Sequence, residues 1–142
     1  MFNILIVAHG KLADEFLNSC KMIVGEQDGI YALGLQSDEG LDGFGARVEK
    51  LFGEINTADG VLIMADLYGG TPCNTVTLEI LSKYYNSELI TGANLSMVIE
   101  AAANRSGNLK EAINLLKDVG VGDICNMREK LKEEDDADSA NE

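Results

Sequence analysis

The sequence predicts one α/β domain, a doubly wound and mostly parallel sheet with helices on both faces. Two observations lead to this prediction. Short apolar runs alternate with longer segments whose apolar residues recur at helical spacing, which is typical of βαβ units. The length of 142 residues is that of a single domain. We expect the domain to span residues 1–127 and an acidic, disordered tail to span residues 128–142.

The first half of the chain holds two strand and helix pairs. Asn3–Ala8 is an almost entirely apolar run and predicts a buried strand. Leu12–Val24 follows with apolar residues on one helical face. A second strand is predicted at Ile30–Leu35 and a second helix at Leu41–Ile55. Together these segments form the first crossover units of a parallel sheet.

The third strand is predicted at Val61–Ala65, a continuous apolar stretch that a strand covered on both faces requires. A glycine-containing turn follows it. Thr71 is the expected N-cap of the next helix, with Pro72, the only proline, at the first helical position. This helix is expected to run to about Tyr84.

The second half continues the same alternation. A fourth strand is predicted at Glu88–Gly92, and a short helix from its cap Asn94 to Ala103. Asn108, with a glutamate three residues later, resembles a capping box that opens another helix, which Gly120 is expected to end.

A last short strand is predicted at Val121–Met127. It is separated from the parallel core, so we expect it to pair with an exposed sheet edge of a second subunit. The segment Glu133–Glu142 has six acids, no bases and no large apolar residue, which favours disorder.

Charge and cysteine content exclude several classes of function. Twenty-four acidic and 11 basic residues give a net charge of −13, which disfavours nucleic acid and anionic membranes as partners. Three scattered cysteines without a C-x-x-C pair suggest neither zinc nor disulfides, and no apolar run predicts a signal peptide or a membrane span. We therefore expect a cytoplasmic protein.

Chemistry in such a sheet is expected beyond the carboxyl ends of its strands. Three loops qualify: Ala8–Gly10, Asp66–Pro72 and Gly92–Asn94. Right-handed crossovers place the first and third strands side by side, so His9 and Asp66 are expected to be neighbours. A carboxylate that accepts a hydrogen bond from one ring nitrogen leaves the other as a nucleophile and stabilises the cation formed on attack.

The same edge is predicted to hold an anion. Gly69 and Gly70 allow backbone amides to approach closely, and the helix that begins at Thr71 offers free N–H groups. Each feature alone has a plainer interpretation, because a histidine at a strand end is usually structural and an aspartate there is commonly a cap. Their convergence on adjacent loops is what favours a His/Asp phosphate site.

Three segments resemble a known family: Ile4–Gly10, Asp66–Asn74 and Thr91–Met97. They are similar to the mannose-family IIA component of the bacterial sugar phosphotransferase system. The resemblance implies that His9 accepts a phosphoryl group from the carrier HPr and passes it to a separate IIB component, which serves the membrane subunits IIC and IID. It also implies that Asp66 orients His9.

By the same resemblance, Gly69, Gly70 and Thr71 contact the phosphoryl oxygens, no metal or nucleotide cofactor is needed, and the chain forms a homodimer that exchanges its last strand.

Two alternative functions remain. A phosphoryl-donor subunit of a dihydroxyacetone kinase resembles the same family and uses the same histidine. A receiver-like signalling domain shares the fold, but it needs paired acids where this chain has His9. The sugar is not specified by the sequence.

Overall fold

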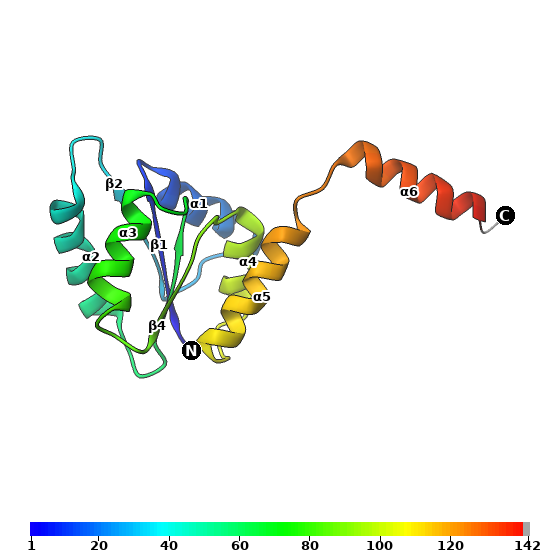
Figure 1. Ribbon diagram of the computed structural model, residues 1–142. Coiled ribbons are helices and arrows are strands. Elements are labelled where there is room, and N and C mark those ends of the chain that lie inside the picture. The colour runs from blue at the N-terminus through cyan, green and yellow to red at the C-terminus, as the bar shows by residue number, and fades with distance from the viewer. Residues whose placement is uncertain (141–142) are drawn as a thin grey trace.

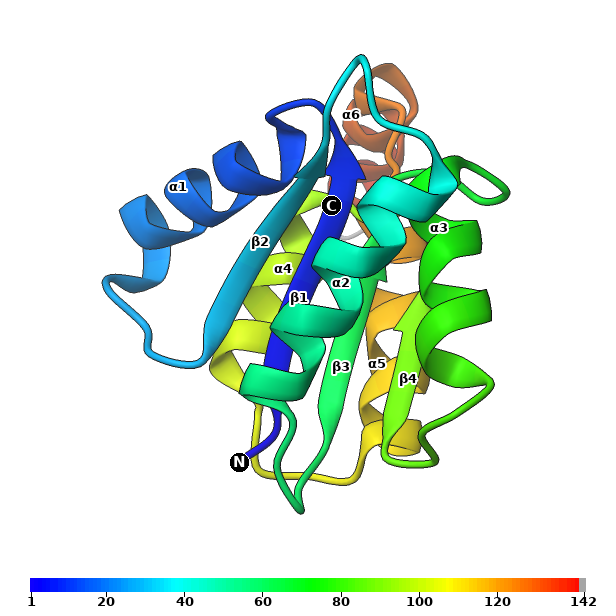
Figure 2. The same cartoon turned by 90° about the vertical axis from the view of Figure 1, so that its left-hand side faces the viewer.

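Four parallel strands form one sheet in the order β2-β1-β3-β4. They appear in a computed structural model whose described residues are 1–140. Figure 2 shows β1 (Asn3–His9) and β3 (Val61–Ala65) in the middle, with β2 (Ile30–Leu35) and β4 (Ser87–Ile90) at the edges. The predicted parallel sheet, with its first and third strands adjacent, is confirmed.

Helices cover both faces of this sheet, as Figure 1 shows with the sheet between two groups of helices. One group contains α1, α4 and α5, and the other contains α2, α3 and the π-helical turn η1 that continues α3 without a break. The bounds are α1 Leu12–Val24, α4 Leu95–Ala103, α5 Leu109–Gly122, α2 Leu41–Ile55, α3 Thr71–Val76 and η1 Thr77–Leu81.

The core therefore has two layers that share the central strands. Side chains of a strand alternate between its faces, so Ile4 and Ile6 pack toward α1 and α4, whereas Leu5 and Val7 pack toward α2 and α3. All four side chains are fully buried. Burial on both faces explains why β1 reads as a continuous apolar run.

Two of the three predicted helix caps are confirmed. The Oδ1 atoms of Asn94 and Asn108 accept hydrogen bonds from the backbone N–H groups three residues later, at 3.0 and 3.1 Å. The predicted cap Thr71 is wrong, because Gly70 occupies the N-cap position and Thr71 is the first helical residue. The preceding turn, closed by a bond from Gly70 N to Leu67 O at 3.3 Å, brings the chain into the helix one residue early.

The strand predicted at Val121–Met127 is wrong. Helix α5 continues through Gly120 to Gly122, and α6 begins at Met127. Gly120 does not end the helix: it lets α4 and α5 pack closely, since a Cβ there would lie 2.6 Å from the Met97 sulfur. Exchange of this segment between subunits is not seen in the structure of the single chain.

The C-terminal segment forms a helix where its composition predicted disorder. Helix α6 (Met127–Ala140) points away from the sheet in Figure 1 and has no buried residue. Asn126 caps it by accepting from the Arg128 N–H at 3.0 Å. Glutamate, lysine and leucine are strong helix formers, so a segment of this composition can also form a solvent-exposed helix. Residues 141–142, the end of the predicted tail, lie outside the described residues.

At the amino ends of the strands, Arg105 joins three segments of the chain. Its side chain is buried, and its guanidinium donates to the carbonyl oxygen of Phe2 at 2.9 Å, to Asn3 Oδ1 at 3.1 Å, and to the carbonyl oxygens of Asp28 and Gly29. These partners are uncharged oxygens of the backbone and of the Asn3 amide.

We expect Arg105→Met to lower the free energy of unfolding by about 3 kcal/mol, because the buried Phe2 carbonyl oxygen and three partly buried oxygens lose charged donors. Urea denaturation measures the difference. The matched control is Arg128→Met, on exposed α6, which should change stability by less than about 0.5 kcal/mol. Equal effects of the two substitutions would show that the Arg105 bonds contribute nothing.

Candidate functional site

His9 and Asp66 meet at the carboxyl edge of the sheet. β1 and β3 pair in register, with Val7 opposite Ala65, so the residues that end these strands share one edge. The strand order reverses between these two strands, which is where doubly wound sheets form their sites. His9 Nδ1 lies 2.8 Å from Asp66 Oδ2, and the predicted juxtaposition is therefore present.

The Asp66 carboxylate is held in place by backbone donors. Its Oδ2 accepts from the His9 N–H at 2.9 Å and its Oδ1 from the Leu67 N–H at 2.8 Å. Burial raises the pKa of the Asp66 carboxyl, but the hydrogen bonds from His9 and Leu67 outweigh this effect and the pKa lies below its ordinary value of 3.8. Asp66 is thus a fixed anion at neutral pH.

This anion determines which ring nitrogen of His9 is free. An ionised carboxylate only accepts hydrogen bonds, so in the neutral ring the proton is assigned to Nδ1 and the lone pair to Nε2. The His9 side chain is 45% exposed whereas that of Asp66 is 7% exposed. The pair therefore presents an accessible nucleophilic nitrogen, backed by a shielded carboxylate that stabilises a cationic ring.

The loop between β3 and α3 approaches the imidazole through a glycine. A Cβ at Gly70 would lie 2.9 Å from His9 Cε1 and 3.6 Å from Nε2, so a side chain there would press on the ring. Gly69 has φ +79° and makes the turn. Of the three predicted phosphoryl-binding residues, the structure brings Gly70 to His9, and it places Gly69 and Thr71 in the same loop and at the start of α3.

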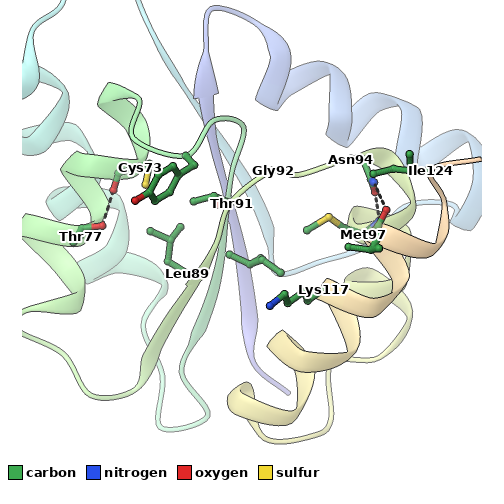
Figure 3. Close-up of a pocket in the computed structure, with 13 residues that line it drawn as sticks. Cys73, Thr77, Leu89, Thr91, Gly92, Asn94, Met97, Lys117 and Ile124 are labelled. Atoms are coloured by element: carbon green, nitrogen blue, oxygen red, sulfur yellow. Dashed lines mark hydrogen bonds between the residues drawn. The ribbon is translucent and has the colours of Figure 1, made fainter.

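The third predicted loop lies beside the end of β3, where the Ala93 N–H donates to the Ala65 carbonyl at 3.1 Å, but its side chains face a neighbouring groove. Gly92 and Asn94 line an apolar groove of about 590 Å³ between α3, β4, α4 and α5. Figure 3 shows Cys73 and Thr77 on one side of this groove and Lys117 on the other. The Asn94 side chain has a structural role, because its amide donates to the Gly120 carbonyl at 3.1 Å.

Gly34 of β2 lies against the residue that follows His9, although no motif identifies it. This residue of β2 pairs with Ala8 and lies beneath the carbonyl of Gly10, directly after His9. A glycine inside a predicted strand often marks a close backbone approach, and this was the signal that could have found it.

The lowered pKa of Asp66 makes a prediction for stability in acid. A carboxyl whose pKa is depressed in the folded state stabilises that state above its ordinary pKa, and the contribution is lost as pH falls through the folded value. The difference in the free energy of unfolding between the wild type and Asp66→Asn should therefore be constant down to about pH 5 and shrink in stronger acid. Denaturant titrations at each pH measure it, and a difference that grows with acidity would contradict the assignment.

Two kinds of feature are absent from residues 1–140. Within this range no three histidine, cysteine, aspartate or glutamate side chains gather as metal ligands would. No helix in the same range has the length and apolar character needed to cross a membrane.

The fold and the site define a class of protein, the doubly wound α/β domains that carry an oriented histidine at the switch point. Residues 3–119 match the family model described as the IIA component of the fructose phosphotransferase system (PTS). The chain belongs to this family of PTS IIA components, the mannose-type family. Such components are phosphotransferases of sugar transport.

Individual relatives agree with the family assignment. The chain is 29% identical over 106 residues to the mannose-specific EIIAB component of Escherichia coli, covering 72% of this chain and 31% of that protein. It is 26% identical to the fructose-specific EIIA component of Bacillus subtilis, covering 82% and 80%. The solved mannose/sorbose-specific IIA subunit of Enterococcus faecalis is 31% identical, with a TM-score of 0.82 over 88% of this chain and 93% of that one. The chain thus spans about a third of the E. coli relative.

Proposed function

We propose that this chain is a phosphoryl carrier that accepts a phosphoryl group from phospho-HPr on His9 Nε2 and passes it to a IIB component. The observation that carries the proposal is the 2.8 Å contact between His9 Nδ1 and Asp66 Oδ2, because it leaves Nε2 as the free nitrogen. Membership of the PTS IIA family supports the same role.

In the proposed step, the Nε2 lone pair of His9 attacks the phosphorus of phospho-HPr. The new N–P bond forms as the N–P bond to the donor histidine breaks, and the electron pair returns to that donor ring. The Nδ1 proton stays between His9 and Asp66, whose negative charge stabilises the cationic character of the phosphorylated ring. Donor and product are both phosphoramidates, so positioning supplies most of the catalysis.

Residues of the β3–α3 loop complete the proposed site. Gly70 adjoins the imidazole edge that includes Nε2, so the backbone N–H groups near Gly69 and Gly70 and the hydroxyl of Thr71 are proposed to contact the phosphoryl oxygens. Helix N–H groups without an intrahelical acceptor favour such an anion. No metal or nucleotide cofactor takes part in this scheme.

The proposal extends to partners and assembly. The E. coli relative is an EIIAB protein, which supports a IIB component as the acceptor of the phosphoryl group, with the membrane subunits IIC and IID served indirectly. We further propose a cytoplasmic homodimer, whose mass light scattering measures directly. A monomer over the whole working concentration range would contradict the dimer and leave the carrier role unaffected.

Reconstituted transfer tests the function. Incubation with phosphoenolpyruvate, enzyme I and HPr should add one acid-labile phosphoryl group per chain, and a IIB component added afterwards should remove it. Omission of HPr is the control and should leave the chain unlabelled. A chain that stays unlabelled in the complete mixture would overturn the proposal, and label that no IIB component removes, but that a dihydroxyacetone kinase removes, would assign the chain to that kinase.

A further inference from the structure

We propose that Gly34 is a positioning residue for His9: the absence of a side chain at this point of β2 lets the Gly10 carbonyl lie over the strand, and this fixes the imidazole against Asp66. The relevance to phosphoryl transfer rests on the proposed function. The positioning itself rests on geometry alone.

The space above Gly34 is filled by backbone. A Cβ at Gly34 would lie 2.0 Å from the Gly10 carbonyl oxygen and 3.2 Å from its carbon. Contacts this short cannot be relieved by rotating a side chain, because both atoms belong to the main chain. Any residue other than glycine must therefore displace the Gly10–Lys11 peptide group, one residue beyond His9.

The backbone conformation and a hydrogen bond of Gly10 hold its carbonyl over Gly34. Its φ is +59°, in the left-handed region, and its N–H donates to the Leu35 carbonyl at 2.8 Å. His9 is thus tied on one side to Asp66, through its N–H and its ring, and on the other side to β2 through Gly10.

Hydrogen bonds from side chains hold the end of β2 in place. The Gly34 carbonyl accepts from Arg47 Nη1 at 3.1 Å, and the same Nη1 lies 2.6 Å from Glu39 Oε1. Glu39 Oε1 in turn accepts from the Gln36 N–H at 2.9 Å. With β2 held in this way, a side chain at Gly34 is expected to move Gly10 and to lengthen the contact between His9 Nδ1 and Asp66.

His9 is the only histidine, so its ring nitrogens give a single pair of signals in ¹⁵N NMR of histidine-labelled protein. In the wild type with a neutral ring, we expect Nδ1 to be of the protonated, pyrrole type and Nε2 of the unprotonated, pyridine type. In Gly34→Ala both signals should move toward the average that tautomer exchange produces.

The matched control is Gly53→Ala, at an exposed position of α2 where a Cβ meets nothing within 4 Å. It should keep the wild-type pair of signals. In transfer assays Gly34→Ala should lower kcat on the order of 10- to 100-fold, as expected for a displaced reacting group, with little change in the KM for phospho-HPr. Gly53→Ala should leave both parameters unchanged.

A second variant tests the proposal even if Gly34→Ala does not fold. A Cβ at Gly10 meets no neighbouring atom within 4 Å, but a β-branched residue such as that in Gly10→Val cannot adopt φ +59° without strain, so the turn must open. We expect the same averaged signals, with Gly10→Asn closer to the wild type because asparagine tolerates this region. Wild-type signals in folded Gly34→Ala, or in Gly10→Val, would overturn the inference. Because these spectra need no partner protein, a wild type that fails to accept phosphoryl would count against the proposed function alone.

Discussion

Replacement of His9 by glutamine is expected to abolish phosphorylation of the chain. Glutamine occupies similar space but has no nitrogen lone pair that can attack phosphorus, and the sequence offers no second histidine. The fold should be retained, since the His9 ring is 45% exposed and the Asp66 carboxylate keeps its two backbone donors. Radiolabelled phosphoenolpyruvate with enzyme I and HPr measures the incorporation, and thermal denaturation verifies the fold.

A matched substitution far from the site guards against indirect effects. Tyr85 is fully exposed beside the start of β4, at the opposite edge of the sheet from His9, so Tyr85→Gln should be labelled like the wild type. Label retained by folded His9→Gln would show that another residue accepts the phosphoryl group.

Substitution of Asp66 by asparagine is expected to slow transfer by roughly 10²- to 10⁴-fold while the protein stays folded. The amide has no negative charge, so it cannot stabilise the cationic ring. Its NH₂ group can also donate to Nδ1 and favour the tautomer with the proton on Nε2, where the nucleophilic lone pair is needed. Rapid-quench measurement of transfer from phospho-HPr gives the rate.

The control for this charge removal is Asp59→Asn. Asp59 is exposed and pairs with the N-terminal ammonium group at 2.8 Å, at the amino end of the sheet. It loses the same charge without touching His9, so its transfer rate should equal that of the wild type. An unchanged rate in Asp66→Asn, with unchanged thermal stability, would remove Asp66 from the mechanism.

The central pair was predictable because two simple rules fix it. A histidine and an aspartate end two apolar runs, and right-handed crossovers make those runs adjacent strands. No long-range detail is needed beyond that. Gly34 escaped prediction because its importance comes from the backbone of Gly10, which approaches it only after the strands pair. The position of Thr71 was missed for a similar reason, since a turn upstream decides where α3 begins.

The C-terminal part was predicted least well, and its two errors have different causes. Val121–Met127 is apolar enough for a strand, but strand formation needs a neighbour, and α5 instead continues through Gly120 because Gly120 packs on Met97. Helix α6 has strong helix formers and no tertiary contacts that bury its residues. Composition shows that such a segment is solvated, and cannot by itself distinguish a solvated helix from a disordered chain.

The position of the phosphoryl group on the ring tests the account most directly. Protein labelled with ¹⁵N at histidine and phosphorylated through HPr should show ³¹P–¹⁵N coupling at Nε2, with Nδ1 still protonated and bonded to Asp66. This result follows from the 2.8 Å contact that occupies Nδ1. Coupling at Nδ1 would mean that the ring leaves Asp66 to react, and it would contradict the assignment of Asp66 as the group that orients His9.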